Sequence, residues 1–227
     1  MAEKFFEGKD FERGDFKALM PKYYPLKYKR YIEEEVELLK LKLTSANRIL
    51  EAGVGIGRLI PELAPLVKEF VGIDNAYLML KKSKEIAKKF SNVKIIKGNL
   101  ENIGKLFPKK HFDFSICLWN TLGNVKDEAQ ILTEISKVTS KSIFITVYNQ
   151  GTLRNRMSWY KTVGVEISKI DDNTETVYSK SGLKSKAYSL TNIKEIAKAA
   201  NLRIKTSKIL AGVILWVELV SPAPKDR

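Results

Sequence analysis

The sequence predicts an α/β fold in which a mostly parallel sheet is covered by helices on both faces. Strand-like and helix-like segments alternate along residues 48–149. Two strand-like runs, FDFSICLW at 112–119 and SIFITVY at 142–148, are apolar almost throughout, which is typical of parallel strands buried on both faces. The last two strands are joined by Ala211 and Gly212, a link too short for a parallel crossover, so they form an antiparallel hairpin at one edge.

Local sequence signals define the individual elements. Pro25 opens a helix over 25–43, whose Glu33-Glu34-Glu35 run is expected to be a solvated face. Pro61 and Pro65 are expected to shorten or kink a helix over 58–67. The remaining segments are strands at 48–50, 70–74, 93–98, 112–119 and 141–148, helices at 76–90, 127–139 and 191–202, and hairpin strands at 202–210 and 212–220.

The length of 227 residues is consistent with one domain. Its predicted parts are an N-terminal helical lid (1–44), a cofactor-binding core (45–149), an insertion on the substrate side (150–189), and a closing helix and hairpin (190–220). The insertion shows no clear periodicity and is rich in Ser, Lys and Tyr. We expect it to be a substrate lid over the sheet edge.

Composition excludes several kinds of chemistry. His111 is the one histidine and Cys117 the one cysteine, so a His/Cys zinc cage cannot form within the chain, and no metal is expected. A serine or cysteine hydrolase would have to use His111 and would lack the G-x-S-x-G turn. Cys117 is expected in the core. The chain has no apolar run long enough to span a membrane and no signal peptide, which predicts a soluble, cytoplasmic protein.

The net charge of +14 leaves two interpretations open. A basic surface attracts phosphates, so nucleic acid is a possible partner. The excess charge is spread along the chain and is mostly lysine, which favours a solvated surface.

The most informative segment is the glycine-rich loop Glu51-Ala52-Gly53-Val54-Gly55-Ile56-Gly57-Arg58. A strand, a run of glycines and a helix start bring backbone N–H groups against a polar or anionic ligand. The segment does not fit the phosphate-binding G-x-x-x-x-G-K-[ST] pattern, and Arg58 stands where the dinucleotide pattern needs its third glycine.

This acid-x-G-x-G-x-G loop resembles the first motif of the class I S-adenosylmethionine-dependent methyltransferases. The resemblance covers residues 45–150, and the C-terminal helix and hairpin match the end of that family's fold. It implies a Rossmann-like three-layer sandwich with a seven-stranded, mostly parallel sheet, and S-adenosyl-L-methionine as cofactor.

The resemblance also assigns cofactor contacts. The glycines allow close backbone approach to the methionine moiety, Glu51 lies near its amino group, and Asp74 accepts hydrogen bonds from the ribose hydroxyls. Asn99 stands where the family often has an acid for the adenine amino group, and Glu101 is its competitor. The full set of implied contacts is Glu51, Gly53, Gly55, Gly57, Asp74, Asn75, Asn99, Leu100, Trp119 and Asn120.

The segment Trp119-Asn120-Thr121-Leu122-Gly123-Asn124 lacks the proline and aromatic of nucleic-acid amino methyltransferases. It is most similar to small-molecule members of the glycine and sarcosine N-methyltransferase type. We therefore expect methyl transfer by in-line displacement to nitrogen or oxygen of a small molecule. An RNA or protein methyltransferase, and a cofactor-binding module without turnover, are the alternatives. The catalytic residue is left unassigned, with Tyr24, Asn120 and Tyr148 as candidates.

Overall fold

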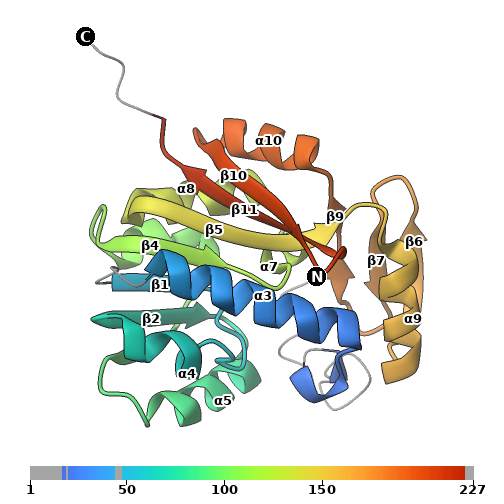
Figure 1. Cartoon of the computed structure of the whole chain (residues 1–227), viewed down its shortest axis with the longest axis horizontal. Helices are drawn as coiled ribbons and strands as arrows, with labels where there is room; N and C mark the ends of the chain where they lie inside the picture. The colour runs from blue at the N-terminus through green and yellow to red at the C-terminus, as the bar shows by residue number, and fades with distance from the viewer. Residues whose placement is uncertain (1–16, 19, 44–47, 223–227) are drawn as a thin grey trace.

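The computed structural model describes residues 17–18, 20–43 and 48–222. Residues 1–16, 19 and 44 of the predicted N-terminal lid (1–44), and the following Ser45, lie outside the described residues. The described chain forms one large sheet with helices on both faces, which confirms the predicted fold class (Figure 1). Among the described helices, none is long and apolar enough to cross a membrane.

The large sheet has the order β10-β11-β5-β4-β1-β2-β3, with a short β9 paired to β5. The strands β1 to β5 pair in parallel, and β11 runs antiparallel to both β5 and β10, as the short hairpin link requires. Eight strands therefore replace the seven predicted. They are β1 (Arg48–Ala52), β2 (Glu69–Asp74), β3 (Val93–Lys97), β4 (Phe112–Cys117), β5 (Thr139–Asn149), β9 (Ala187–Tyr188), β10 (Arg203–Leu210) and β11 (Ile214–Val220).

Two hydrophobic cores lie on the two faces of the sheet. Successive strand residues point to opposite faces, so Ile49 and Phe144 join one core while Leu50 and Ile145 join the other. The first core is covered by α3 (Leu26–Leu43), α4 (Ile60–Leu63), η3 (Ala64–Leu66) and α5 (Tyr77–Ala87). The second is covered by α6 (Ile103–Leu106), α8 (Glu128–Val138) and α10 (Leu190–Ala199).

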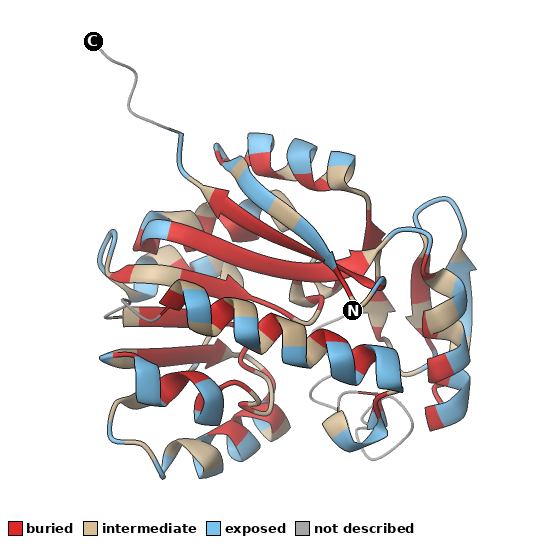
Figure 2. Cartoon of the chain, in the orientation of Figure 1, coloured by how far each residue is buried: buried red, intermediate tan, exposed pale blue. Residues whose placement is uncertain are grey.

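Helix α3 lies across the first face and turns its apolar side to the sheet (Figure 2). The prediction that Glu33-Glu34-Glu35 is a solvated face was wrong for two of the three residues. Glu33 is exposed, but Glu34 is half-buried and accepts a hydrogen bond from the Ala211 N–H at 3.0 Å. Glu35 is fully buried. The periodicity of the helix places Glu35 one turn after Tyr31, on the buried side.

The insertion has more regular structure than its sequence indicates. It contains α9 (Leu153–Val163), whose C-terminus ends at Gly164 in a left-handed conformation. A small antiparallel sheet follows, built from β6 (Ile167–Asp171), β7 (Thr176–Ser179) and β8 (Lys184–Ser185). Arg156 on α9 is fully buried and donates to the backbone carbonyls of Ser185 and Glu175 at 2.8 and 2.6 Å. It therefore ties α9 to the small sheet.

Candidate active site

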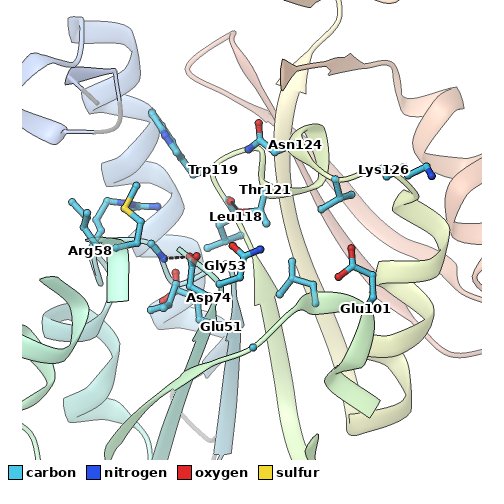
Figure 3. Close-up of a pocket in the computed structure, with 18 of the residues that line it drawn as sticks. Glu51, Gly53, Arg58, Asp74, Glu101, Leu118, Trp119, Thr121, Asn124 and Lys126 are labelled. Carbon is cyan, nitrogen blue, oxygen red and sulfur yellow. Dashed lines mark hydrogen bonds between the residues drawn. The ribbon is translucent and has the colours of Figure 1, made fainter. Parts of the chain in front are cut away.

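A cavity of about 350 Å³ lies at the carboxyl ends of β1, β2, β3 and β4 (Figure 3). Because these strands are parallel, the loops that follow them meet at one edge of the sheet, where α/β proteins bind ligands. The cavity is lined by Tyr24, Glu51, Gly53, Val54, Gly55, Ile56, Arg58, Asp74, Asn75, Met79, Gly98, Leu100, Glu101, Leu118, Trp119, Thr121, Asn124, Val125 and Lys126.

The glycine loop after β1 forms one wall. The N–H groups of Gly53 and Val54 both donate to the carbonyl of Ile73 in β2, at 2.9 and 3.0 Å, and this fixes the loop to the neighbouring strand. Gly55 has φ +52°, and a Cβ there would meet nothing within 4 Å, so its backbone is open to the cavity. Gly57 has φ +80°, and a Cβ there would lie 3.1 Å from the Cα of Ser83. Gly57 therefore serves the packing of the loop on α5.

Asp74, the last residue of β2, links the two loops. One carboxylate oxygen accepts from the N–H of Gly55 at 2.8 Å and the other accepts from the N–H of Ala76 at 3.0 Å. Burial raises the pKa of the Asp74 carboxyl, and these backbone donors partly offset that effect. Each oxygen keeps a lone pair for a further donor from the cavity.

Glu51 and Arg58 place an acidic and a basic side chain in the same wall. Glu51 is buried and Arg58 is half-buried; the buried atoms Oε2 of Glu51 and Nη1 of Arg58 have no hydrogen-bond partner among the described residues. Burial raises the pKa of Glu51 to about 8, with Glu35 and Asp74 adding to the effect and Arg58 opposing it. Unpaired polar atoms in such a position are costly unless a ligand pairs with them.

The end of β4 forms the opposite wall. Trp119 and Asn120 are in the left-handed region, with φ +52° and +59°, which is unusual for a bulky residue such as tryptophan. The Oδ1 atom of Asn120 accepts from the N–H of Tyr148 at 3.2 Å, and its backbone N–H donates to the carbonyl of Thr146. These bonds hold the turn into α7 (Thr121–Asn124), and they hold Trp119 at the cavity.

Aromatic rings from distant segments cover this wall. The rings of Tyr24 and Tyr31 both stack on Trp119, with centroids 4.5 and 5.3 Å apart. Trp159 of α9 meets Trp119 edge to face at 5.9 Å, and Tyr28 contacts both tryptophans. We call these five residues the aromatic layer. Two of its members, Tyr24 and Trp119, also line the cavity.

A family model described as a methyltransferase domain matches residues 43–199 of the chain. The chain belongs to this methyltransferase family. The prediction of a methyltransferase is thereby confirmed. No curated protein matches the chain.

Several solved structures share the fold. The PH0226 protein of Pyrococcus horikoshii is 22% identical with a TM-score of 0.71, covering 92% of this chain and 99% of that one. The 1,6-didemethyltoxoflavin-N1-methyltransferase of Burkholderia thailandensis, solved with its substrate and S-adenosylhomocysteine, is 13% identical with a TM-score of 0.66, covering 85% and 79%. The magnesium protoporphyrin IX methyltransferase of Synechocystis, solved with S-adenosylhomocysteine, is 13% identical with a TM-score of 0.63, covering 88% and 86%.

Seven of the predicted contacts of this methyltransferase line the cavity. They are Glu51, Gly53, Gly55, Asp74, Asn75, Leu100 and Trp119.

The other three predicted contacts do not line the cavity. Gly57 packs on α5, Asn120 is buried behind Trp119, and Asn99 is exposed although its neighbours Gly98 and Leu100 line the cavity. Glu101, the competitor of Asn99, does line it.

The three candidate catalytic residues are also separated. Tyr24 lines the cavity, whereas Asn120 and Tyr148 do not. Burial raises the pKa of the Tyr24 and Tyr148 hydroxyls well above the ordinary value. A phenol of this kind stays protonated at neutral pH and is a poor general base.

Neither of the two residues considered for other chemistry lines the cavity. His111 precedes β4, at the opposite end of that strand, and its Nε2 is 3.3 Å from a Glu69 oxygen. Cys117 is fully buried, as expected, and burial raises its pKa to about 12.

Sequence reasoning missed Arg58 and the short helix α7. In the sequence, Arg58 stands out only as the residue that breaks the dinucleotide pattern. A charged residue directly after a buried glycine turn was the available signal. Helix α7 has four residues, too few for a periodic pattern, and Val125 and Lys126 after it were not predicted to line the cavity.

Proposed function

We propose that this methyltransferase transfers the methyl group of S-adenosyl-L-methionine to a nitrogen or oxygen atom of a small molecule by in-line displacement. One observation carries the proposal. Glu51 has a buried carboxylate oxygen without a hydrogen-bond partner, Arg58 has a buried guanidinium nitrogen without one, and both residues line the same cavity as Asp74. This donor and acceptor set complements the zwitterionic amino-acid end of the cofactor and its ribose.

The residues of the cavity fit the cofactor part by part. Glu51 accepts from the ammonium group, and Nη1 of Arg58 donates to the carboxylate. The two Asp74 oxygens, each already accepting one backbone N–H, accept from the two ribose hydroxyls. The backbone of Gly55 borders the methionine moiety, and Asn75 and Leu100 border the adenine. When bound, the cofactor supplies an electrophilic methyl group on its sulfonium.

The surroundings of Trp119 favour a small molecule as the methyl acceptor. The aromatic layer and α3 cover Trp119, so a folded polymer has less access to this wall than a compact ligand. Apolar rings exclude water from the reacting atoms, and alignment of donor and acceptor lowers the barrier. The Burkholderia and Synechocystis enzymes named above act on small molecules. On the basis of the Trp119–Asn124 segment, we propose that the chain is of the glycine and sarcosine N-methyltransferase type.

The candidate tyrosines are poor general bases. The raised pKa of Tyr24 leaves little phenolate at neutral pH. We therefore propose an acceptor whose reacting atom carries a free lone pair, so that its proton leaves to solvent after transfer. Positioning then accounts for most of the rate enhancement.

Calorimetric titration with S-adenosylmethionine, S-adenosylhomocysteine and NAD tests the cofactor. We expect micromolar affinity for the first two and none for NAD. Failure of the first two would overturn the proposal. The variant Asp74→Ala is the matched control for binding at this cavity.

Transfer of a tritiated methyl group into separate pools of metabolites, RNA and protein then tests the acceptor. Label in the metabolite pool supports the proposal. Label in RNA or protein would favour the alternative use of the basic surface, with RNA binding that weakens steeply with salt. Cofactor binding without label in any pool would indicate a binding module.

A further inference from the structure

A buried carboxylate on α3 is hydrogen-bonded to groups that belong to, or support, both walls of the cavity. Glu35 is fully buried. Its Oε2 accepts from Nη2 of Arg58 at 2.6 Å, and its Oε1 accepts from the hydroxyls of Tyr31 and of Thr146, the latter at 2.8 Å. A buried charge is tolerated when it is paired and its lone pairs are satisfied, and both conditions are met here.

The bond from Arg58 connects Glu35 to the wall that the glycine loop forms, which we call the cofactor wall. A guanidinium is a rigid planar fork, so fixing one terminal nitrogen fixes the direction of the other. The bond from Nη2 to Glu35 leaves Nη1 buried and without a partner in the described chain, on a side chain that lines the cavity (Figure 3). The Glu51 carboxylate, which interacts with Arg58 electrostatically, offers an alternative partner. The pairing with Glu35 therefore keeps Arg58 from turning to Glu51 and blocking both groups.

The bonds from Tyr31 and Thr146 connect Glu35 to the opposite wall at the end of β4, which we call the acceptor wall. The hydroxyl of Thr146 donates to Glu35 and accepts from the backbone N–H of Trp119 at 2.9 Å. Tyr31, the other donor to Glu35, stacks on the Trp119 ring. Trp119 sits in a left-handed conformation that its surroundings must maintain. One carboxylate thus contacts groups that fix both Arg58 and Trp119.

We propose that Glu35 is a positioning residue of the methyl-transfer site, which orients Arg58 toward the carboxylate of the cofactor and holds Trp119 through Thr146. The inference rests on the proposed function, because it assumes that the cavity holds S-adenosylmethionine. Glu35 touches neither substrate nor cofactor, and it acts through Arg58, Thr146 and Tyr31.

The test compares Glu35→Gln with Glu33→Gln. Both variants remove one negative charge from α3, but Glu33 is exposed. Two ligands are titrated, S-adenosylhomocysteine and 5′-methylthioadenosine, which lacks the amino-acid end. We expect Glu35→Gln to weaken S-adenosylhomocysteine binding about tenfold, in line with loss of a charge-assisted contact. Its affinity for methylthioadenosine is expected to stay within about twofold of wild type, and Glu33→Gln is expected to change neither affinity.

A double-mutant cycle with Arg58→Gln separates positioning from general stability. If Glu35 acts through Arg58, adding Glu35→Gln to Arg58→Gln causes no further loss of S-adenosylhomocysteine affinity. Multiplied losses, or an equal loss for both ligands, would overturn the proposal. Should Glu35→Gln not fold, Glu35→Asp keeps the charge but shortens its reach, and the same selective loss is expected.

Different results would overturn the proposed function and the role of Glu35. Wild-type protein that binds neither S-adenosylmethionine nor S-adenosylhomocysteine would overturn the proposed function, and this inference with it. Wild-type binding together with an unchanged Glu35→Gln affinity would overturn only the role of Glu35.

Discussion

The two walls of the cavity are built in different ways. The cofactor wall comes from the ends of β1, β2 and β3 and the loops after them, all within residues 51–101, and its key partners are backbone N–H groups, carboxylates and one guanidinium. The acceptor wall brings together Tyr24, Trp119 and Trp159 from distant parts of the chain, and its contacts are mainly aromatic. A fixed cofactor favours a short local motif, whereas a variable acceptor is met by packing between distant segments.

The largest expected effect separates stability from cofactor binding. Arg156→Met removes the buried guanidinium that bonds to Ser185 and Glu175 and lies over the Tyr148 ring at 4.9 Å. We expect unfolding free energy to fall by about 3–5 kcal/mol, because buried partners are left unpaired. S-Adenosylhomocysteine affinity of the folded protein is expected to stay unchanged.

Chemical denaturation measures this effect, and Arg154→Met on the exposed side of α9 is the control. A loss of cofactor affinity in Arg156→Met that matches its loss of stability would contradict the separation of the two walls.

Asp74→Ala is expected to show the largest effect on cofactor binding. It removes the acceptor for the N–H groups of Gly55 and Ala76 and the acceptor that we propose for two ribose hydroxyls. Hydrogen bonds to a charged group contribute about 1.5–3 kcal/mol each, so affinity for S-adenosylhomocysteine should fall at least about 100-fold. Calorimetry measures the loss, and retained affinity would remove Asp74 from the site.

Gly55 and Gly57 distinguish contact with the ligand from packing. Leucine at Gly55 projects into open cavity space, so Gly55→Leu should weaken S-adenosylhomocysteine binding about 100-fold by exclusion. Gly55→Ala adds the backbone strain with little volume and serves as its control. Gly57→Ala should instead lower the melting temperature, because its Cβ meets the backbone of Ser83. An equal loss of affinity in Gly57→Ala would contradict this division.

The pH dependence of binding tests Glu51. With its pKa raised to about 8, Glu51 is mostly protonated at pH 6 in the free protein and must lose this proton to pair with an ammonium group. Affinity for S-adenosylhomocysteine should therefore rise with pH by up to about tenfold per unit. It should fall again at higher pH, once the ligand amino group loses its proton.

Arg58, Glu35, Asp74 and Cys117 interact electrostatically with Glu51, and Glu51→Gln isolates its contribution. Glu51→Gln should remove the rising limb. Methylthioadenosine should show a flat profile with the wild-type protein. A rising limb that persists in Glu51→Gln would assign the titration to another group.

The smallest effect is expected for Tyr24→Phe. The ring that stacks on Trp119 is kept, and the hydroxyl is protonated at neutral pH because burial raises its pKa. Methyl transfer to the acceptor found in the metabolite pool should change less than about threefold. A loss of more than tenfold with unchanged cofactor affinity would restore Tyr24 as the catalytic base.

The accuracy of sequence-based prediction follows the same division between the walls. The Glu51–Gly57 loop, Asp74 and Leu100 could be placed because each follows a strand and the strands are parallel. Asn99 is exposed between Gly98 and Leu100, which line the cavity, because the turn after β3 decides which neighbours face it. Asn120 and Tyr148 were associated correctly with the β4 and β5 ends, but they bond to each other behind Trp119.

The sequence by itself determined the α/β class, the antiparallel hairpin, the methyltransferase family and the loop at the cofactor wall, because alternation of apolar residues and short turns are properties of neighbouring residues. Only the tertiary structure decided that Glu35 is buried against Arg58, that Tyr31 and Tyr24 stack on Trp119, and that Arg156 is enclosed by the insertion. These contacts join segments from different parts of the chain, and the burial that makes them strong exists only once the helices have packed on the sheet.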